Sequence, residues 1–415
     1  MAALTLSDLM NRSSANQIIR GAAKGIATTD FLGAVIPIRT FQGPSIAYQR
    51  ERSLGTAAFI PDSGAIGAAT NGADDLVTVP VRRVASDLDV DSLVDDLTNG
   101  SEMGGQILKR LKSTWRIITQ KVATGGNTTG FTMSDNFQGG AYVDAITAYS
   151  AYLDSGRYGN GSLKYTHTGT FLQFRAPGDA QFGDQVACAA DGSYTLYSSN
   201  KSKWITVTLD VSDASANATR EITFTSNTYE FDGLNRVISP AMVAASGGAD
   251  GDAMSFNVLD QLMSLEKVRS NRAFIMNSKL VFKFLSSLRA LGGANPEHVR
   301  LPGIGADTIA YRGVPILEND WIPSTEAKGA ATTLSSVYLA SLDSSEGLFL
   351  GVPGTGLDEV DVDGDPRRSN VMGFRIEKIG ALEGAAHRRT RVQWYGALGL
   401  GSDLALARAS EIITL

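Results

Sequence analysis

The sequence predicts an α+β fold. Three observations predict it: one long amphipathic helical pattern, several strand patterns that alternate apolar and polar residues, and a helix, strand and helix in direct succession in the second half. With 43% hydrophobic and 19% charged residues, the composition is that of a folded protein. A single core stops growing at about 250 to 300 residues. The 415 residues therefore predict two or three structural units.

Charge, cysteine content and hydropathy limit the classes of function. The chain has 37 basic and 43 acidic residues, a formal net charge of -6, so its overall charge gives no reason to expect tight nucleic-acid binding. Cys188 is the only cysteine, which rules out an intrachain disulfide and suits a reducing cytoplasm. Residues 1–20 lack the apolar core of a signal peptide, and no stretch approaches the roughly 18 apolar residues of a membrane span. No membrane partner is expected.

An arm and an extended hairpin are expected first. Leu4 to Thr28 has short helical patterning with little apolar face to bury alone. Two alternating strands, Ile46 to Arg50 and Val77 to Val81, flank a tip rich in Gly and Ala from Gly55 to Ala73. Apolar residues near this tip have few neighbours in sequence and need another surface, for which a second subunit is the obvious candidate. The predicted intersubunit contacts are Arg50, Arg52, Phe59, Ile60, Ile66, Arg82 and Arg83.

A long helix is expected from Ser101 to just before Gly125 and Gly126, which supply the backbone freedom of a helix terminus. Its apolar stripe consists of Met103, Ile107, Leu108, Leu111, Trp115, Ile118 and Val122, and it predicts packing on a sheet. Its bases lie mainly off the stripe: Lys109, Arg110, Lys112, Arg116 and Lys121. A run of acids precedes the helix, and we expect these acids to stabilise its N-terminus through the helix dipole. They are Asp87, Asp89, Asp91, Asp95 and Asp96.

A β-rich insertion is expected next, because the chain from Asn127 to Gly251 is rich in Gly, Ser, Thr, Asn and Tyr. A short helical pattern runs through Ala141, Ile146 and Tyr149. From Trp204 to Val211 apolar and polar residues alternate, which predicts a sheet with one buried side. We expect the ends of this unit to lie close together, so that residues 132–248 can be replaced by a linker without unfolding the rest.

The second half begins with a helix from Ser255 to about Ser270 and a strand from Ala273 to Met276. A second helix follows, capped by Asn277 or Ser278 and closed by Gly292 and Gly293. Next come a strand that ends at Tyr311, a turn at Arg312 and Gly313, and a buried strand from Val314 to Leu317.

The order of these elements resembles the major capsid fold of tailed bacteriophages, which bacterial encapsulins share. Two segments carry the resemblance most strongly: Ala273 to Ser278 with its following helix, and Tyr311 to Asn319. Ser336 to Leu342 resembles the family's strand before a small-residue turn, and Arg389 to Val392 resembles a late strand of its peripheral domain. Together these segments and the earlier elements cover most of the chain outside the insertion.

The resemblance implies six parts: an N-terminal arm (1–43), an extended hairpin loop (44–85), a peripheral domain with the spine helix (86–131), the β-rich insertion domain (132–250), an axial domain (251–375) and returning peripheral strands (376–415). It implies a virion subunit that forms hexamers and pentamers of an icosahedral head with copies of itself, assembled in the host cytoplasm. Scaffolding, portal and decoration proteins are further candidate partners. Packaged double-stranded DNA is expected to be enclosed without sequence specificity.

No catalytic site, cofactor or metal is predicted. His167, His298 and His387 stand far apart, and with one cysteine they offer no zinc-binding spacing. The carboxylates Asp358, Glu359, Asp361, Asp363 and Asp365 are expected to form a solvated loop, because Gly364 is misplaced for an EF-hand. Cys188 lies in an apolar run, where a small buried hydrophobe is its simplest role.

Three other functions stay open. An encapsulin-like compartment shares the fold, although the large insertion favours a phage head. A tail or adhesion protein would explain the Tyr-bearing insertion but not the long helix. An enzyme of glycan or ester chemistry could use paired carboxylates such as Asp358 and Asp361, but no pocket signature supports it.

Some members of the family cross-link their shells through an isopeptide bond from a lysine on the hairpin. Here no lysine occurs between Lys24 and Lys109, and a protonated guanidinium is a poor nucleophile. The resemblance therefore implies non-covalent shells for this chain.

Overall fold

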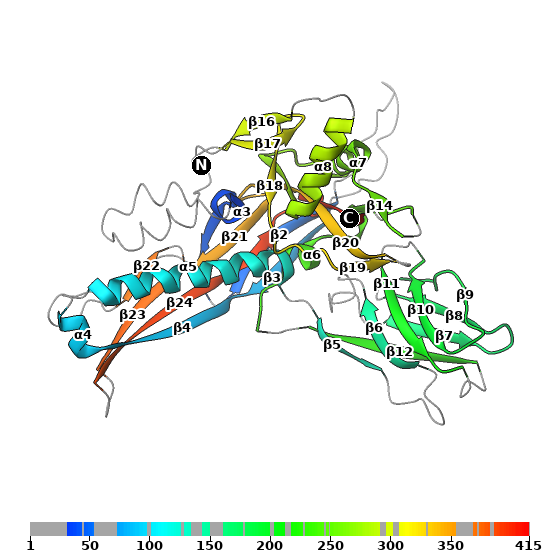
Figure 1. The fold of residues 1–415 in the computed structure, drawn as a ribbon, viewed down its shortest axis with the longest axis horizontal. Helices are drawn as coiled ribbons and strands as arrows, with labels where there is room; N and C mark the ends of the chain where they lie inside the picture. Colours follow the sequence, from blue (N-terminus) through cyan, green and yellow to red (C-terminus); the bar gives the residue numbers. More distant parts are fainter. Residues whose placement is uncertain are drawn as a thin grey trace, which may run out of the picture.

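A computed structural model shows the fold in Figure 1. It describes residues 31–414 except for a set of gaps: 44, 54–72, 98–100, 126–127, 134–142, 150–160, 177–178, 200–202, 212–216, 227–228, 245, 249, 291–295, 302–306, 329–330, 354–367, 372 and 382–385. The predicted arm from Leu4 to Thr28, the hairpin tip and the acidic segment from Asp358 to Asp365 lie outside the described residues. The predicted α+β class is confirmed by the helices and sheets of the described chain.

The spine of the molecule is α5 (Ser101–Thr124), which packs on a sheet as the apolar stripe predicts. Leu111, Trp115, Ile118 and Val122 are each at most 2% exposed. Figure 1 shows α5 running along β4 and β24, with the short helix α4 (Ser92–Leu97) at one end of the molecule. In the described chain this sheet has six strands: β1 (Ile38–Phe41), β21 (Leu348–Pro353), β24 (His387–Leu400), β23 (Phe374–Ala381) and β22 (Arg368–Val371), with β4 (Arg82–Asp91) paired to β24.

A second sheet holds the helix, strand and helix of the second half. Its strands in the described chain are β13 (Val243–Ala244), β14 (Asp252–Ala253), β15 (Arg272–Met276), β16 (Glu297–Arg300), β17 (Asp307–Tyr311), β18 (Val314–Glu318), β19 (Glu326–Lys328), β20 (Ala331–Ser341) and β25 (Leu406–Ile413). Two helices pack on it, α7 (Phe256–Leu265) and α8 (Ser278–Ala290). The ring of Phe256 stacks on Tyr311 at 5.5 Å and meets Phe284 edge-on at 5.6 Å, which joins both helices to β17.

The sequence predicted this second unit closely. Asn277 caps α8, since its Oδ1 accepts a hydrogen bond from the Lys279 backbone N–H at 3.0 Å. The strand from Val314 is buried, as expected. However, α7 ends at Leu265 rather than near Ser270, because the next residue leaves the helical conformation and its carboxylate bonds elsewhere: Glu266 Oε1 accepts a hydrogen bond from Ser341 Oγ at 2.7 Å.

The stretch in which the insertion is expected contains two sheets and a core of its own. The sheets consist of β5 (Thr128–Met133), β12 (Ala218–Ser226), β7 (Gly161–Thr166), β8 (Phe171–Arg175) and β9 (Val186–Ala187), and of β6 (Val143–Tyr149), β10 (Gly192–Tyr197) and β11 (Trp204–Leu209). Ile205, Val207 and Leu209 are at most 1% exposed, so the alternation correctly predicted a buried face. The helix expected through Ala141, Ile146 and Tyr149 is wrong. Ile146 and Tyr149 lie on β6, where pairing with β11 overrides the weak helical spacing, and Ala141 lies outside the described residues.

Two predicted boundaries also differ from the structure. The insertion was expected to reach residue 250, yet Phe231, α6 (Leu234–Val237) and η2 (Pro240–Met242) contribute side chains to the main core. The axial part was expected at 251–375 and the peripheral strands at 376–415. Instead the chain enters the six-stranded sheet at β21 and returns to the nine-stranded sheet at β25, after the turn η3 (Asp403–Ala405). The order of elements in the sequence could not reveal where the chain passes from one sheet to the other, because long-range strand pairing decides this.

Candidate assembly surfaces

The extended hairpin is formed by β2 (Ser45–Ser53) and β3 (Ala73–Pro80), which pair antiparallel from Ser45 opposite Pro80 to Ser53 opposite Ala73. In the described residues the two strands make a sheet of their own. This agrees with the predicted hairpin. The strands alternate, so Ile46 and Tyr48 are buried against the body while Ala47 and Gln49 face outward.

The base of the hairpin is anchored to the main core. The ring of Tyr48 meets Phe349 edge-on at 5.4 Å, and its hydroxyl accepts a hydrogen bond from the Leu400 backbone N–H at 3.0 Å. The Arg50 guanidinium forms an ion pair with Asp403. On β3, by contrast, the Leu76 side chain is 73% exposed. The described hairpin strands therefore lie fixed on the body and expose the apolar side chain of Leu76 to solvent.

The predicted contact residues lie in different surroundings. Arg50 is buried and serves the fold of its own chain through Asp403. Arg82 is half-buried and Arg83 exposed, both at the start of β4. Arg52 lies on β2, and its side chain is outside the described set. Phe59, Ile60 and Ile66 also lie outside the described residues. An intersubunit role for these seven residues stays a prediction.

A ladder of ion pairs joins β4 to β24, and sequence reasoning missed it. Arg391 Nε and Nη2 donate to the two carboxylate oxygens of Asp87 at 2.6 and 2.9 Å. Arg389 does the same for Asp89 at 2.6 and 2.7 Å. These guanidinium hydrogen bonds lower the pKa of both carboxyl groups. The pairs are bidentate, the geometry in which arginine and carboxylate interact best.

The expected role of these acids at the N-terminus of the long helix is therefore wrong for Asp87 and Asp89. They alternate with Leu88 and Val90, which are buried, and this period of two is the strand signal that could have revealed β4. Asp91 does act at a helix N-terminus, but that of α4: its Oδ1 accepts the Leu93 backbone N–H at 2.8 Å.

The short helix α4 presents an apolar surface that the sequence analysis did not identify. Leu93 is 66% exposed and Leu97 is 76% exposed, and they lie four residues apart on one helix face. The helix is tied to the end of β24, since Arg388 Nη1 donates to Asp96 Oδ1 at 2.8 Å. In the sequence these leucines stand among aspartates, so the segment had the pattern of an acidic run rather than of an apolar surface.

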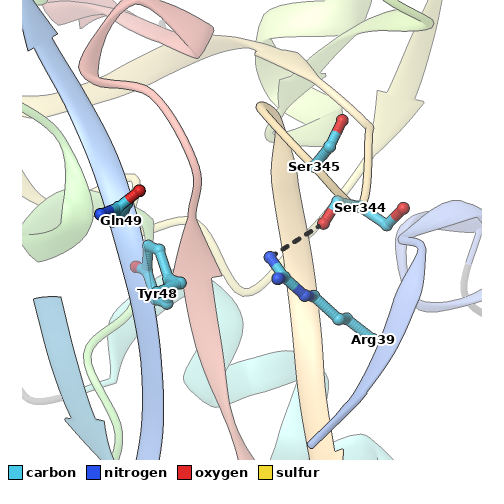
Figure 2. Close-up of a pocket in the computed structure, with 5 residues that line it drawn as sticks. All are labelled: Arg39, Tyr48, Gln49, Ser344 and Ser345. Atoms are coloured by element: carbon cyan, nitrogen blue, oxygen red, sulfur yellow. Dashed lines mark hydrogen bonds between the residues drawn. The ribbon is translucent and has the colours of Figure 1, made fainter. Parts of the chain in front are cut away.

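A shallow cavity of about 470 Å³ lies beside the hairpin base, lined by Arg39, Tyr48, Gln49, Ser344 and Ser345 (Figure 2). Arg39 Nη1 donates to the backbone oxygen of Ser344 at 3.4 Å, the interaction dashed in the figure. The Ser345 hydroxyl donates to Asp343 at 2.9 Å. A serine nucleophile needs a base such as histidine, and none of the lining residues is one. The cavity thus offers polar contacts rather than an acid–base pair.

The three histidines are at the surface, and Cys188 is buried. His167, His298 and His387 are exposed and belong to a turn after β7, to β16 and to β24 respectively. Within the described ranges, no group of three or more potential metal ligands comes together. Cys188 is fully buried in the core of the insertion, and this burial raises the pKa of its thiol. No helix in the described chain is long and apolar enough to cross a membrane.

Comparison with known proteins gives no sequence match: neither a family model nor a curated protein matches the chain. Among solved structures, the chain is similar to an encapsulin from Synechococcus elongatus (14% identity, TM-score 0.49, 92% of this chain and 88% of that chain). It is also similar to the capsid of cyanophage A-1(L) (10% identity, TM-score 0.48, 91% and 90%). A virus-like particle from Pyrococcus furiosus is similar over 94% and 95% of the two chains, at 8% identity and a TM-score of 0.39.

A phage capsid and an encapsulin are thus among the solved structures to which this chain is similar. The order of elements along the described chain is as follows. A paired hairpin precedes a long helix on a sheet, a β-rich insertion follows, and a helix-covered sheet closes the chain.

Proposed function

We propose that this chain is the structural subunit of a closed protein shell, the head of a tailed bacteriophage. The observation that carries the proposal is the hairpin β2–β3. Its base is fixed by Tyr48 and Arg50, while its outer strand exposes Leu76 and pairs with no further strand in the described chain. An unpaired strand edge that also exposes a leucine is a surface on which another chain can pair, so a neighbouring subunit is its natural partner.

A second exposed surface supports the same conclusion. The helix α4, whose Leu93 and Leu97 side chains are exposed, lies at the opposite end of α5 from the insertion (Figure 1). Exposed leucines at two separate places on one subunit suit a lattice, in which each copy contacts several others. We propose hexamers and pentamers of identical chains as the units of this lattice.

The finer features of the proposal follow from the phage class. The shell encloses double-stranded DNA without sequence specificity, assembles in the host cytoplasm and remains part of the virion. Scaffolding, portal and decoration proteins are its candidate partners. The chain acts by assembly rather than by catalysis, and needs no cofactor.

The test shortens the hairpin. Residues 54–72 are replaced by a two-residue Asn-Gly turn, which suits antiparallel strands. A matched control replaces 382–385, between the paired strands β23 and β24, by the same turn. We expect the hairpin variant to stay soluble with an unchanged melting temperature but to form no closed particles by negative-stain microscopy, whereas the control assembles.

Particles of normal size and yield from the hairpin variant would show that the hairpin is not an intersubunit clamp. The contents of the particles separate phage head from encapsulin-like compartment. Heads made in a host with the packaging machinery contain DNA, while a compartment made alone captures protein cargo. Protein cargo without DNA would replace the phage proposal by the compartment.

A further inference from the structure

The outward side of α5 carries a row of basic residues: Lys109, Lys112 and Arg116, named here the basic face. All three are exposed, while Leu111, Trp115 and Ile118 on the other side of the helix are buried. Spacings of three and four residues bring the three side chains to one face of a helix. At about 1.5 Å per residue, the row extends roughly 10 Å along the axis.

No described carboxylate neutralises this face. Lys121, one turn beyond it, pairs with Glu230 at 2.7 Å, but in the described chain no ion pair involves Lys109, Lys112 or Arg116. The one acid in the helix sequence is Glu102, seven residues before Lys109 and so about 10 Å away along the axis.

The acids of β4 lie on the far side of the sheet. Leu88 and Val90 are buried in the core that α5 covers, so Asp87 and Asp89, which alternate with them, point the other way. Both are already bound to arginines of β24. The basic face therefore keeps its positive charge in a chain whose formal net charge is -6.

The face is also held in position. The helix beneath it is fixed by buried Trp115, and the Arg116 guanidinium lies over the ring of Trp321 at 6.0 Å. Trp321 comes from the loop after β18, so two separate parts of the chain place this guanidinium at the surface. Because this contact already restricts the arginine side chain, less conformational entropy is lost when the side chain binds a ligand.

We infer that the basic face binds the phosphate backbone of double-stranded DNA, and that α5 therefore faces the inside of the shell. The inference rests on the proposed function and deepens it by assigning the surface that meets the packaged DNA. Phosphates favour this face through charge complementarity, and contacts to phosphate carry no sequence information, in keeping with non-specific packaging.

The test measures binding of a fluorescein-labelled 30-base-pair duplex by anisotropy, with the purified full-length chain at 50 to 200 mM KCl. The variant is Lys109→Gln/Lys112→Gln/Arg116→Gln. The control, Lys267→Gln/Lys279→Gln/Arg289→Gln, removes the same charge from exposed positions on and beside α7 and α8. Each phosphate neutralised adds about 0.9 to the slope of log K against log salt, so the variant should lose about 2.7 from that slope.

Across this salt range, wild-type affinity should then fall about 40-fold more than that of the variant, while the control keeps the wild-type slope. Equal slopes for variant and wild type, or equal losses in variant and control, would overturn the inference. So would tighter binding of labelled poly-glutamate than of the duplex, which would identify an acidic protein as the partner. Particles of both variants are counted by microscopy, so a failure of shell assembly is seen separately from a failure of DNA binding.

Discussion

Two deletions of the insertion should have opposite outcomes. One follows the boundary seen in the structure, and the other follows the boundary expected from sequence. Its ends meet, because Thr128 on β5 lies opposite Ser226 on β12. Just beyond, the Gly233 backbone N–H donates to the Gly125 oxygen at 2.9 Å. A linker of three or four Gly and Ser residues in place of 129–225 therefore has to span only the short distance between paired residues.

The loss of stability on each deletion depends on which hydrophobic core loses side chains. The core of the insertion is separate: no described residue between Ala123 and Phe231 belongs to the main core. Deletion of 129–225 should leave the free energy of unfolding of the remaining body within about 1 kcal/mol of its value in the full chain. The reason is that free-energy changes at sites that do not contact each other are additive.

The longer deletion, 132–248, follows the boundary expected from sequence. It also removes the buried side chains Phe231, Leu234, Val237, Ile238 and Met242 from the main core. Each large buried side chain contributes about 2–5 kcal/mol, so their loss together costs at least about 10 kcal/mol. This is comparable to the whole stability of a domain, about 5–15 kcal/mol, and the product should not fold.

Both deletions are assayed by soluble yield and by urea unfolding followed with Trp fluorescence. Trp115 and Trp394 lie in the retained core and report on it in the short deletion. An insoluble short deletion, or a long deletion as stable as the short one, would refute the assignment of two independent cores.

Four further predictions concern single features. Arg50→Ala leaves Asp403 without its buried partner and should cost about 3–5 kcal/mol in urea unfolding, and an unchanged free energy of unfolding would contradict the anchor. The lowered pKa values of Asp87 and Asp89 mean that their ionised forms stabilise the fold above about pH 4, and that this stabilisation is lost as the pH falls through the folded-state pKa values. The melting temperature of Asp87→Asn/Asp89→Asn should thus lie below wild type at pH 7 and converge with it as the pH falls below about 4, and a constant difference would argue against the ladder. The thiol of Cys188 should react with a water-soluble disulfide reagent only when the insertion unfolds, and labelling of the native chain at the rate of a free thiol would place it at the surface. Shells should dissociate to single chains in hot detergent, since the described hairpin strands contain no lysine, and a ladder of covalent multimers on a denaturing gel would overturn this.

The sequence predicted those parts of the fold that depend on local periodicity. The α5 helix could be placed at both ends because its apolar stripe spans many turns and Gly125 follows it. The cap of α8 by Asn277 is also a local interaction. Short patterns were less informative: Ile146 and Tyr149 fit a helix by spacing, and only the pairing of β6 with β11 decides that they form a strand.

The candidate surfaces were harder to predict, for a physical reason. The role of Arg50 depends on Asp403, and that of Asp87 on Arg391, partners some three hundred residues away in the chain. An arginine near a hairpin can serve a neighbouring subunit or its own core, and only the fold distinguishes the two. The exposed leucines of α4 were likewise hidden, because exposure depends on what packs over them.

The central claim is that the chain builds a closed shell, and electron cryo-microscopy of the purified, concentrated protein tests it most directly. We expect closed particles whose capsomers contain six and five copies of the 43.9 kDa chain, with the β2–β3 hairpin of each copy lying on a neighbour and the basic face of α5 turned inward. A solution of single chains at every concentration would contradict it.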